Sequence, residues 1–146
     1  MSAPALTQAP VHSPLALTHR WATLLAPSVF DRRSLWLTWF RADGRQLPLV
    51  MPGDEMPARP DGHLLPGLRE ISAGVAAHVP GDVVHLAMAL CRPGEPAVTR
   101  DDEAWALAAH AVLDDGLDGS WSLHLAAGGR VEPLVEGFPA RRDGAE

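Results

Sequence analysis

The stretch from Asp82 to Leu90 constrains the fold more than any other part of the chain. It reads Asp-Val-Val-His-Leu-Ala-Met-Ala-Leu, an almost unbroken apolar run with β-branched residues at its start. A short run of this kind is typical of a strand buried on both faces, which needs a covering layer on each side of its sheet. The sequence that follows, Cys-Arg-Pro-Gly-Glu-Pro, cannot continue the strand. The run therefore predicts the central strand of a layered α/β domain.

Two β-hairpins are expected around this strand. The first spans Ser34 to Met51, where Asp43-Gly44 separates two apolar runs and predicts a tight turn. The second joins 121–126 to 130–135 through Ala-Gly-Gly. The first strand of the first hairpin is apolar on both faces, so we expect it to be covered on both sides, on one of them by the first helix.

Three helices are expected from caps and periodicity. The first begins at Ser13-Pro14, a cap followed by a proline in the first turn, and ends before Pro27. The second spans Leu65 to His78, and the third begins after the cap Thr99 and ends near Gly116. The second helix is expected to bury the stripe Leu65, Leu68, Ile71 and Val75; the third is expected to bury Trp105, Ala108, Ala109 and Val112 and to carry Asp101, Asp102 and Glu103 in its first turn.

The predicted order is helix, two strands, helix, strand, helix, two strands. With 146 residues the chain has the length of one domain. We therefore expect a single three-layer α/β domain over 13–138, with a mixed central β-sheet flanked by helices. Flexible tails are expected over 1–12 and 139–146, where prolines and polar residues show no periodicity.

Composition limits the functional classes. The net charge is −6 and lysine is absent, so binding to nucleic acid is not favoured. No apolar run reaches the roughly 20 residues that cross a bilayer, and no secretory signal is evident, so a cytoplasmic location is expected. The single cysteine, Cys91, excludes an internal disulfide and a cysteine zinc cluster. Abundant Ala, Gly, Pro and Arg are typical of a GC-rich, and here we infer bacterial, genome.

The segment after the central strand resembles the RadC-like branch of the JAB/MPN metalloprotease family. That family has His-x-His-Pro-x-Gly after a buried strand, then a serine and, three residues later, an aspartate at a helix start. Here Pro93-Gly94 matches the Pro-Gly step, Thr99 takes the place of the serine and Asp102 that of the aspartate. The closing hairpin, with His124 before a Gly-Gly turn, is also similar.

The resemblance implies a JAB/MPN-like fold without its metal. Leu90 and Arg92 replace the two family histidines, so two of three zinc ligands are missing. A catalytic zinc needs three protein ligands and an open position for water. We therefore expect no cofactor and no catalytic residues, as in non-catalytic MPN scaffolding subunits.

Alternatives stay open at the same loop. Asp102 is also explained as ordinary helix N-terminal charge. Cys91 beside Arg92 could have a lowered thiol pKa and act as a nucleophile with His85 or His124 as base. Arg92 could grip an anion at the helix start, or be a surface arginine bound to Glu95 or Asp102.

Other features point to interaction or to metal. A relocated metal site could be formed by His85, His110 and His124, although their spacing does not force them together. A double-faced strand bearing Trp36 and Trp39 could leave one ring exposed for a partner. The expected function is thus a pseudoenzyme-like interaction or scaffold module with an unidentified protein partner, its contact surface either this strand or the acidic third helix. A homodimer is left open, and an enzyme or anion-binding protein using the Cys91/Arg92 loop is the alternative.

Overall fold

The apolar run forms strand β3 (Val83–Cys91), which lies at the centre of a five-stranded sheet in the computed structural model. The strand order is β2-β1-β3-β4-β5. On one side β3 pairs antiparallel with β1 (Ser34–Arg41), and on the other it pairs parallel with β4 (Ser120–Ala127). The sheet is therefore mixed, as predicted. The structure describes residues 10–25, 30–60, 64–78, 82–115, 117 and 119–138.

Both edge strands contain proline. The outer strand β2 (Gln46–Asp54) carries Pro48 and Pro52, and the opposite edge strand β5 (Arg130–Val135) carries Pro133. Proline has no backbone N–H and cannot donate to a ladder, which makes these edges poor templates for a further strand.

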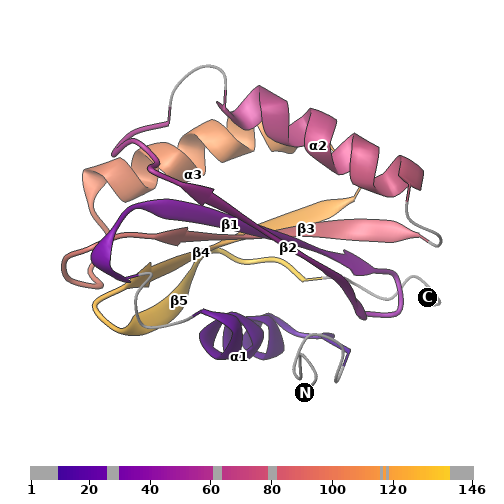
Figure 1. Ribbon diagram of the computed structural model, residues 1–146, viewed down its shortest axis with the longest axis horizontal. Helices are drawn as coiled ribbons and strands as arrows, with labels where there is room; N and C mark the ends of the chain where they lie inside the picture. The colour runs from indigo at the N-terminus through magenta and orange to yellow at the C-terminus, as the bar shows by residue number, and fades with distance from the viewer. Residues whose placement is uncertain are drawn as a thin grey trace.

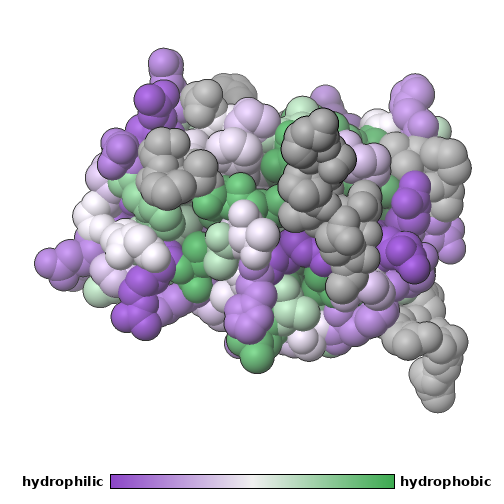
Figure 2. Space-filling model, turned by 60° about the horizontal axis from the view of Figure 1, so that its bottom comes forward, coloured by the Kyte–Doolittle hydropathy of each residue, from purple (hydrophilic) through white to green (hydrophobic). Residues whose placement is uncertain are grey.

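Helices cover the sheet on both faces (Figure 1). On one face lie α2 (Leu64–His78) and α3 (Arg100–Leu113), and on the other lies α1 (Pro14–Leu24). The predicted order of elements and the three layers are confirmed. Figure 2 shows the α1 side, where hydrophobic and hydrophilic side chains are interspersed.

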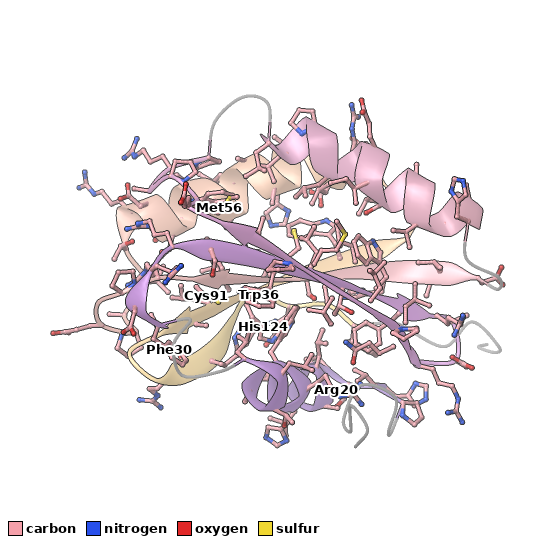
Figure 3. All side chains as sticks on the ribbon, viewed as in Figure 1. Arg20, Phe30, Trp36, Met56, Cys91 and His124 are labelled. Atoms are coloured by element: carbon pink, nitrogen blue, oxygen red, sulfur yellow. The ribbon has the colours of Figure 1, made fainter. Side chains whose placement is uncertain are left out.

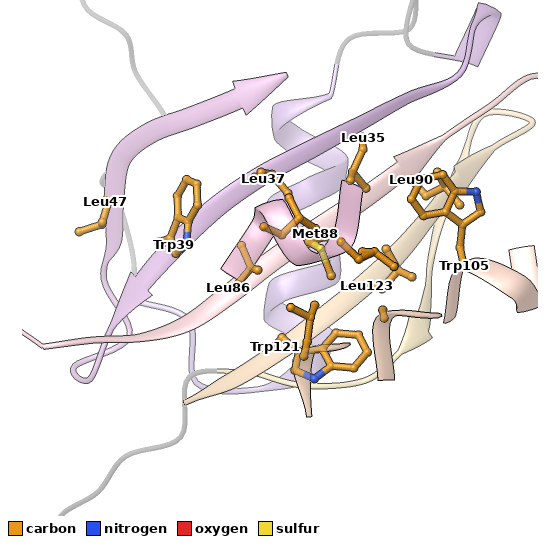
Figure 4. Close-up of a cluster of buried hydrophobic side chains, with 14 residues drawn as sticks. Leu35, Leu37, Trp39, Leu47, Leu86, Met88, Leu90, Trp105, Trp121 and Leu123 are labelled. Atoms are coloured by element: carbon orange, nitrogen blue, oxygen red, sulfur yellow. The ribbon is translucent and has the colours of Figure 1, made fainter. Parts of the chain in front are cut away.

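The alternation of side chains along the strands divides the core in two. The larger cluster lies under α2 and α3 and is almost entirely apolar (Figure 4). Its strand residues are Leu35, Leu37, Trp39, Leu47, Leu86, Met88, Leu90, Trp121 and Leu123. The smaller cluster, under α1, has small strand residues in Ala87, Ala89, Cys91 and Ala126, beside Phe40, and receives Leu17 and Trp21 from the helix.

The predicted turns and caps form as expected. Ser13 Oγ accepts a hydrogen bond from the N–H of Ala16 at 3.0 Å and begins α1. Gly44 adopts φ +84° in the first hairpin turn, and its N–H donates to Arg41 O at 2.9 Å. A side chain in that conformation is strained, which explains the glycine. Thr99 caps α3.

Some expectations differ from the structure. Ile71 is exposed, so the buried stripe of α2 is limited to Leu65 and Leu68, with Val75 half-buried. Val11 is buried and its N–H donates to Gly44 O at 2.7 Å, so the packed chain begins before Ser13.

The predicted ends at Pro27 and Gly116 and the tail over 139–146 lie outside the described residues, as does most of the tail over 1–12. Among the helices that the structure describes, none is long and apolar enough to cross a membrane.

Candidate functional site at the loop between β3 and α3

Arg92 organises the loop over 92–99. Its side chain is only 4% exposed, and all five of its N–H groups donate hydrogen bonds. Nε donates to Asp102 Oδ1 at 2.8 Å and Nη2 donates to Oδ2 at 2.7 Å. The other three N–H groups donate to the carbonyls of Pro93, Glu95 and Ala97 at 2.9–3.0 Å. The guanidinium therefore fixes the path of the loop and has no donor left for an external anion.

Asp102 is the buried partner of Arg92 and a part of the α3 cap. Its Oδ2 also accepts from the backbone N–H of Thr99 at 2.9 Å, and its own N–H donates to Thr99 Oγ1 at 3.1 Å, which closes a capping box. Burial by itself raises the pKa of Asp102, but the hydrogen bonds from Arg92 and Thr99 outweigh it and the net pKa is lowered. Asp102 therefore serves the helix start, as the interpretation of it as helix N-terminal charge predicts.

The two interpretations of Arg92 need correction. The expectation of a surface arginine is wrong because the side chain is buried, although the partner Asp102 is correct. The expectation that Arg92 binds an external anion is also wrong, because the Asp102 carboxylate and three loop carbonyls already accept hydrogen bonds from all of its N–H groups. The hydrogen bond to Asp102 raises the pKa of Arg92, which keeps the pair charged.

Cys91 precedes Arg92 but lies on the opposite face of the sheet, in the cluster under α1. Its side chain is fully buried. Burial raises the pKa of the thiol to about 11, and a hydrogen bond with Ser34 offsets this only in part. The predicted lowering of the thiol pKa is therefore wrong. A buried, protonated thiol is a poor nucleophile.

His124 also faces α1 and not the loop. Its Nε2 lies 2.8 Å from Thr18 Oγ1, and that hydroxyl donates to Pro14 O at 3.1 Å, so Nε2 must carry the proton. Nδ1 is then an acceptor, and it has no hydrogen-bond partner among the described residues. Burial lowers the pKa of His124 to about 4, so the ring is neutral at pH 7.

The three histidines do not form a metal site. His85 lies under α1 between the hydroxyls of Ser120 and Ser122, at 2.6 and 2.9 Å, and burial, with a smaller effect of His124, lowers its pKa to about 3. His110 is exposed on α3 and pairs with Asp114 at 2.9 Å. Within the described ranges, no group of three His, Cys, Asp or Glu side chains could hold a metal ion.

The structure thus brings together only part of the predicted site. Arg92, Thr99 and Asp102 meet at the start of α3, whereas Cys91 and His124 lie on the α1 side of the sheet (Figure 3). The donors present do not fit a catalytic zinc. Leu90 and Arg92 cannot ligate it, and both oxygens of Asp102 are engaged by Arg92 and Thr99.

The tryptophans expected at an interaction surface are not free. Trp39 is 1% exposed, and its Nε1 donates to Ser72 Oγ on α2 at 3.1 Å, so it is a core residue. Trp36 is half-buried, and its Nε1 donates to Ser34 Oγ at 3.0 Å. The interpretation of Trp39 as a partner-binding ring is therefore wrong, and Trp36 presents only part of its ring.

Sequence reasoning missed the polar residues that hold α1 to the sheet. Arg20 Nη1 donates to Gln46 Oε1 at 2.7 Å, and Gln46 Nε2 donates to Thr38 Oγ1 at 2.9 Å. Thr18 on α1 meets His124 in the same interface. Polar residues on the inner face of a strand resemble solvent-facing ones in sequence, so the only available signal was the two-residue alternation that puts 122 and 124 on the face of Ala126.

Comparison of the chain with protein-family models, with curated proteins and with solved structures finds no match.

Proposed function

We propose that this chain is a non-catalytic JAB/MPN-like interaction or scaffold module of a bacterial cytoplasm. The observation that carries the proposal is the buried Arg92–Asp102 pair, at the point where the resembled family has its metal ligands. A loop whose only buried cation and anion satisfy each other has no group left to bind a metal ion or to attack a substrate.

The packing of the resembled motifs supports the family part of the proposal. The loop after β3, the capped start of α3 and the β4–β5 turn lie against one another. Gly128 in that turn has φ +59°, and a Cβ added there would lie 2.7 Å from Pro96 Cδ. The Pro-Gly loop, the start of α3 and the Gly-Gly turn therefore meet in one place, around an ion pair, whereas His124 lies apart on the α1 side.

The outer face of α3 is the contact surface that we propose. Glu103, Leu107 and Ala111 follow one another at four-residue spacing and are all exposed. Leu107 is 71% exposed, the most of the large apolar side chains among the described residues. Of the other first-turn acids, Asp102 is buried and Asp101 pairs with Arg59 at 2.9 Å, so Glu103 supplies the free charge.

This stripe suits a protein partner with a small apolar pocket beside a basic side chain. The test places a photo-crosslinking amino acid at position 107 and, as a control, at position 15 on α1, where Leu15 is 65% exposed on the opposite side of the molecule. We expect one recurrent adduct from position 107 and none from position 15. Its loss in a Glu103→Lys background would identify the charged neighbour as part of the surface.

Equal crosslinking from both positions, or none, would remove the proposed surface. An adduct of twice the chain mass would identify the partner as a second copy, which sedimentation at rising concentration would then test.

Elemental analysis tests the non-catalytic part. After incubation with zinc and removal of the excess, we expect less than stoichiometric metal in the wild type and no change in Asp102→Asn or His124→Gln. Stoichiometric zinc that disappears in either variant would refute the proposal and restore hydrolysis as a function. A Cys91→Ala variant is expected to keep the crosslink at position 107, whereas an enzyme dependent on the thiol would lose its activity.

A further inference from the structure

A cavity of about 210 Å³ lies between the second half of α2 and the beginning of β3. Four residues of α2 line it, at the spacing i, i+3, i+4 and i+7 that puts them on one helix face: Arg69, Ser72, Ala73 and Ala76. On the sheet side the lining includes the apolar Trp39, Val84 and Leu86 and the polar His85 and Ser120, and Leu117 also lines the cavity. This end of the sheet is opposite to the loop at Arg92, so the cavity is separate from the site described above.

Short side chains on the second half of α2 leave this space open. In the first half of the helix, Leu65 and Leu68 fill the space against the sheet. In the second half, Ser72 and the half-buried Val75 continue this face, and the short, exposed side chains of Ala73 and Ala76 border the cavity. The lining combines apolar side chains with polar ones, so the space suits a small molecule that has both an apolar and a polar part.

Two polar groups of α2 line this space. Arg69 is exposed and makes no ion pair or hydrogen bond among the described residues. Ser72 Oγ accepts from Trp39 Nε1 at 3.1 Å, and its own O–H has no acceptor in the same part of the chain. A guanidinium and a hydroxyl donor one helical turn apart provide adjacent donors for a carboxylate.

The volume of the cavity limits the size of the apolar part of a ligand. A cavity of about 150 Å³ lined by aliphatic and aromatic side chains accommodates benzene. A cavity of about 210 Å³ leaves additional room for a short substituent on such a ring.

We propose that this cavity binds a small aromatic carboxylate of the size of phenylacetate. The ring lies against Trp39 and Val84, and the carboxylate receives hydrogen bonds from Arg69 and Ser72. The inference does not depend on the proposed function, because it uses none of the residues of the Arg92 loop or of the outer face of α3.

Calorimetry with three probes tests the site. We expect phenylacetate to bind with one-to-one stoichiometry, whereas benzyl alcohol, which lacks the charge, and acetate, which lacks the ring, bind at least about tenfold more weakly. Arg69→Gln should lower the affinity for phenylacetate by about tenfold. Arg100→Gln, a matched change at an exposed position on α3, should leave the affinity unchanged.

Filling the cavity is the second arm. Ala76→Leu should abolish binding of phenylacetate. If that variant does not fold, Ala73→Leu serves as the cavity-filling variant. Unfolding curves establish whether each variant is folded. Absence of binding to the wild type would overturn the proposal. Equal binding of phenylacetate and benzyl alcohol would overturn it as well, and so would binding that survives in the folded leucine variants.

Discussion

Replacing Arg92 by methionine should be among the most damaging single changes that this chain can undergo. Methionine keeps the apolar part of the side chain but removes both hydrogen bonds to Asp102 and the three to loop carbonyls. The carboxylate of Asp102, 0% exposed, would then be a buried charge without its counter-ion. Breaking a buried pair in this way costs roughly 3–5 kcal/mol. That is a large part of the roughly 5–15 kcal/mol that holds a domain folded.

The assay is urea unfolding followed by tryptophan fluorescence, supported by thermal melts. At roughly 2–4 °C per kcal/mol for a chain near this length, Tm should fall by about 10 °C. Arg59→Met is the matched control, because Arg59 pairs with Asp101 at 2.9 Å on the surface, with 68% of its side chain exposed. It should cost less than about 1 kcal/mol.

A double-mutant cycle with Asp102→Asn then isolates the pair. If the two buried groups stabilise each other, the double variant should be much less destabilised than the sum of the single variants. A loss below about 1 kcal/mol for Arg92→Met, or simple additivity, would refute the argument that the pair organises the loop.

Three further outcomes are expected. Burial lowers the pKa values of His85 and His124 to about 3 and about 4, so the unfolded state binds protons first as pH falls below about 6.5. The free energy of unfolding should therefore drop by about 2 kcal/mol for each histidine by pH 5. Urea midpoints measure this drop, and His124→Gln should make stability depend less steeply on pH. Cys91 should resist alkylation by iodoacetamide in the native state and react in urea, and rapid native labelling followed by mass spectrometry would contradict its burial. Gly128→Ala should destabilise the domain by roughly 1–3 kcal/mol through its positive φ and its approach to Pro96, whereas Gly67→Ala, in a helix with open space around it, should not; equal melting temperatures would argue against the contact between turn and loop.

The order of elements was predictable because each one carries a local signal. Ser13-Pro14, Asp43-Gly44 and Thr99 determine caps and turns through their own backbone and side-chain chemistry, and all three form as expected. The buried stripe of α2 was predicted less well. Residues 71 and 72 are separated by only a 100° step around a helix, and Ser72, not Ile71, lies between Leu68 and Val75 on the inner face.

The candidate site was predictable only where its residues share a helix start. Thr99 and Asp102 lie three residues apart, which is the spacing of a capping box. Cys91 and Arg92 are neighbours in sequence, but successive side chains at the end of a strand point to opposite faces. The thiol therefore never meets the guanidinium, and its pKa rises where sequence proximity suggested that it would fall. The burial of Arg92 depends on three carbonyls of a loop whose path the sequence does not specify.

While the chain is being synthesised, the prolines of β2 protect only one edge of the first hairpin. β1 and β2 emerge together as a hairpin, with Pro48 and Pro52 on one strand, but the partner of the other side of β1 is β3, which begins at Val83. Synthesis proceeds at about 5–20 residues per second, so the edge of β1 that does not pair with β2 stays unpaired for roughly 2–8 s before β3 emerges. β1 carries apolar side chains on both faces, so in this interval its unpaired edge is open to pairing with another molecule.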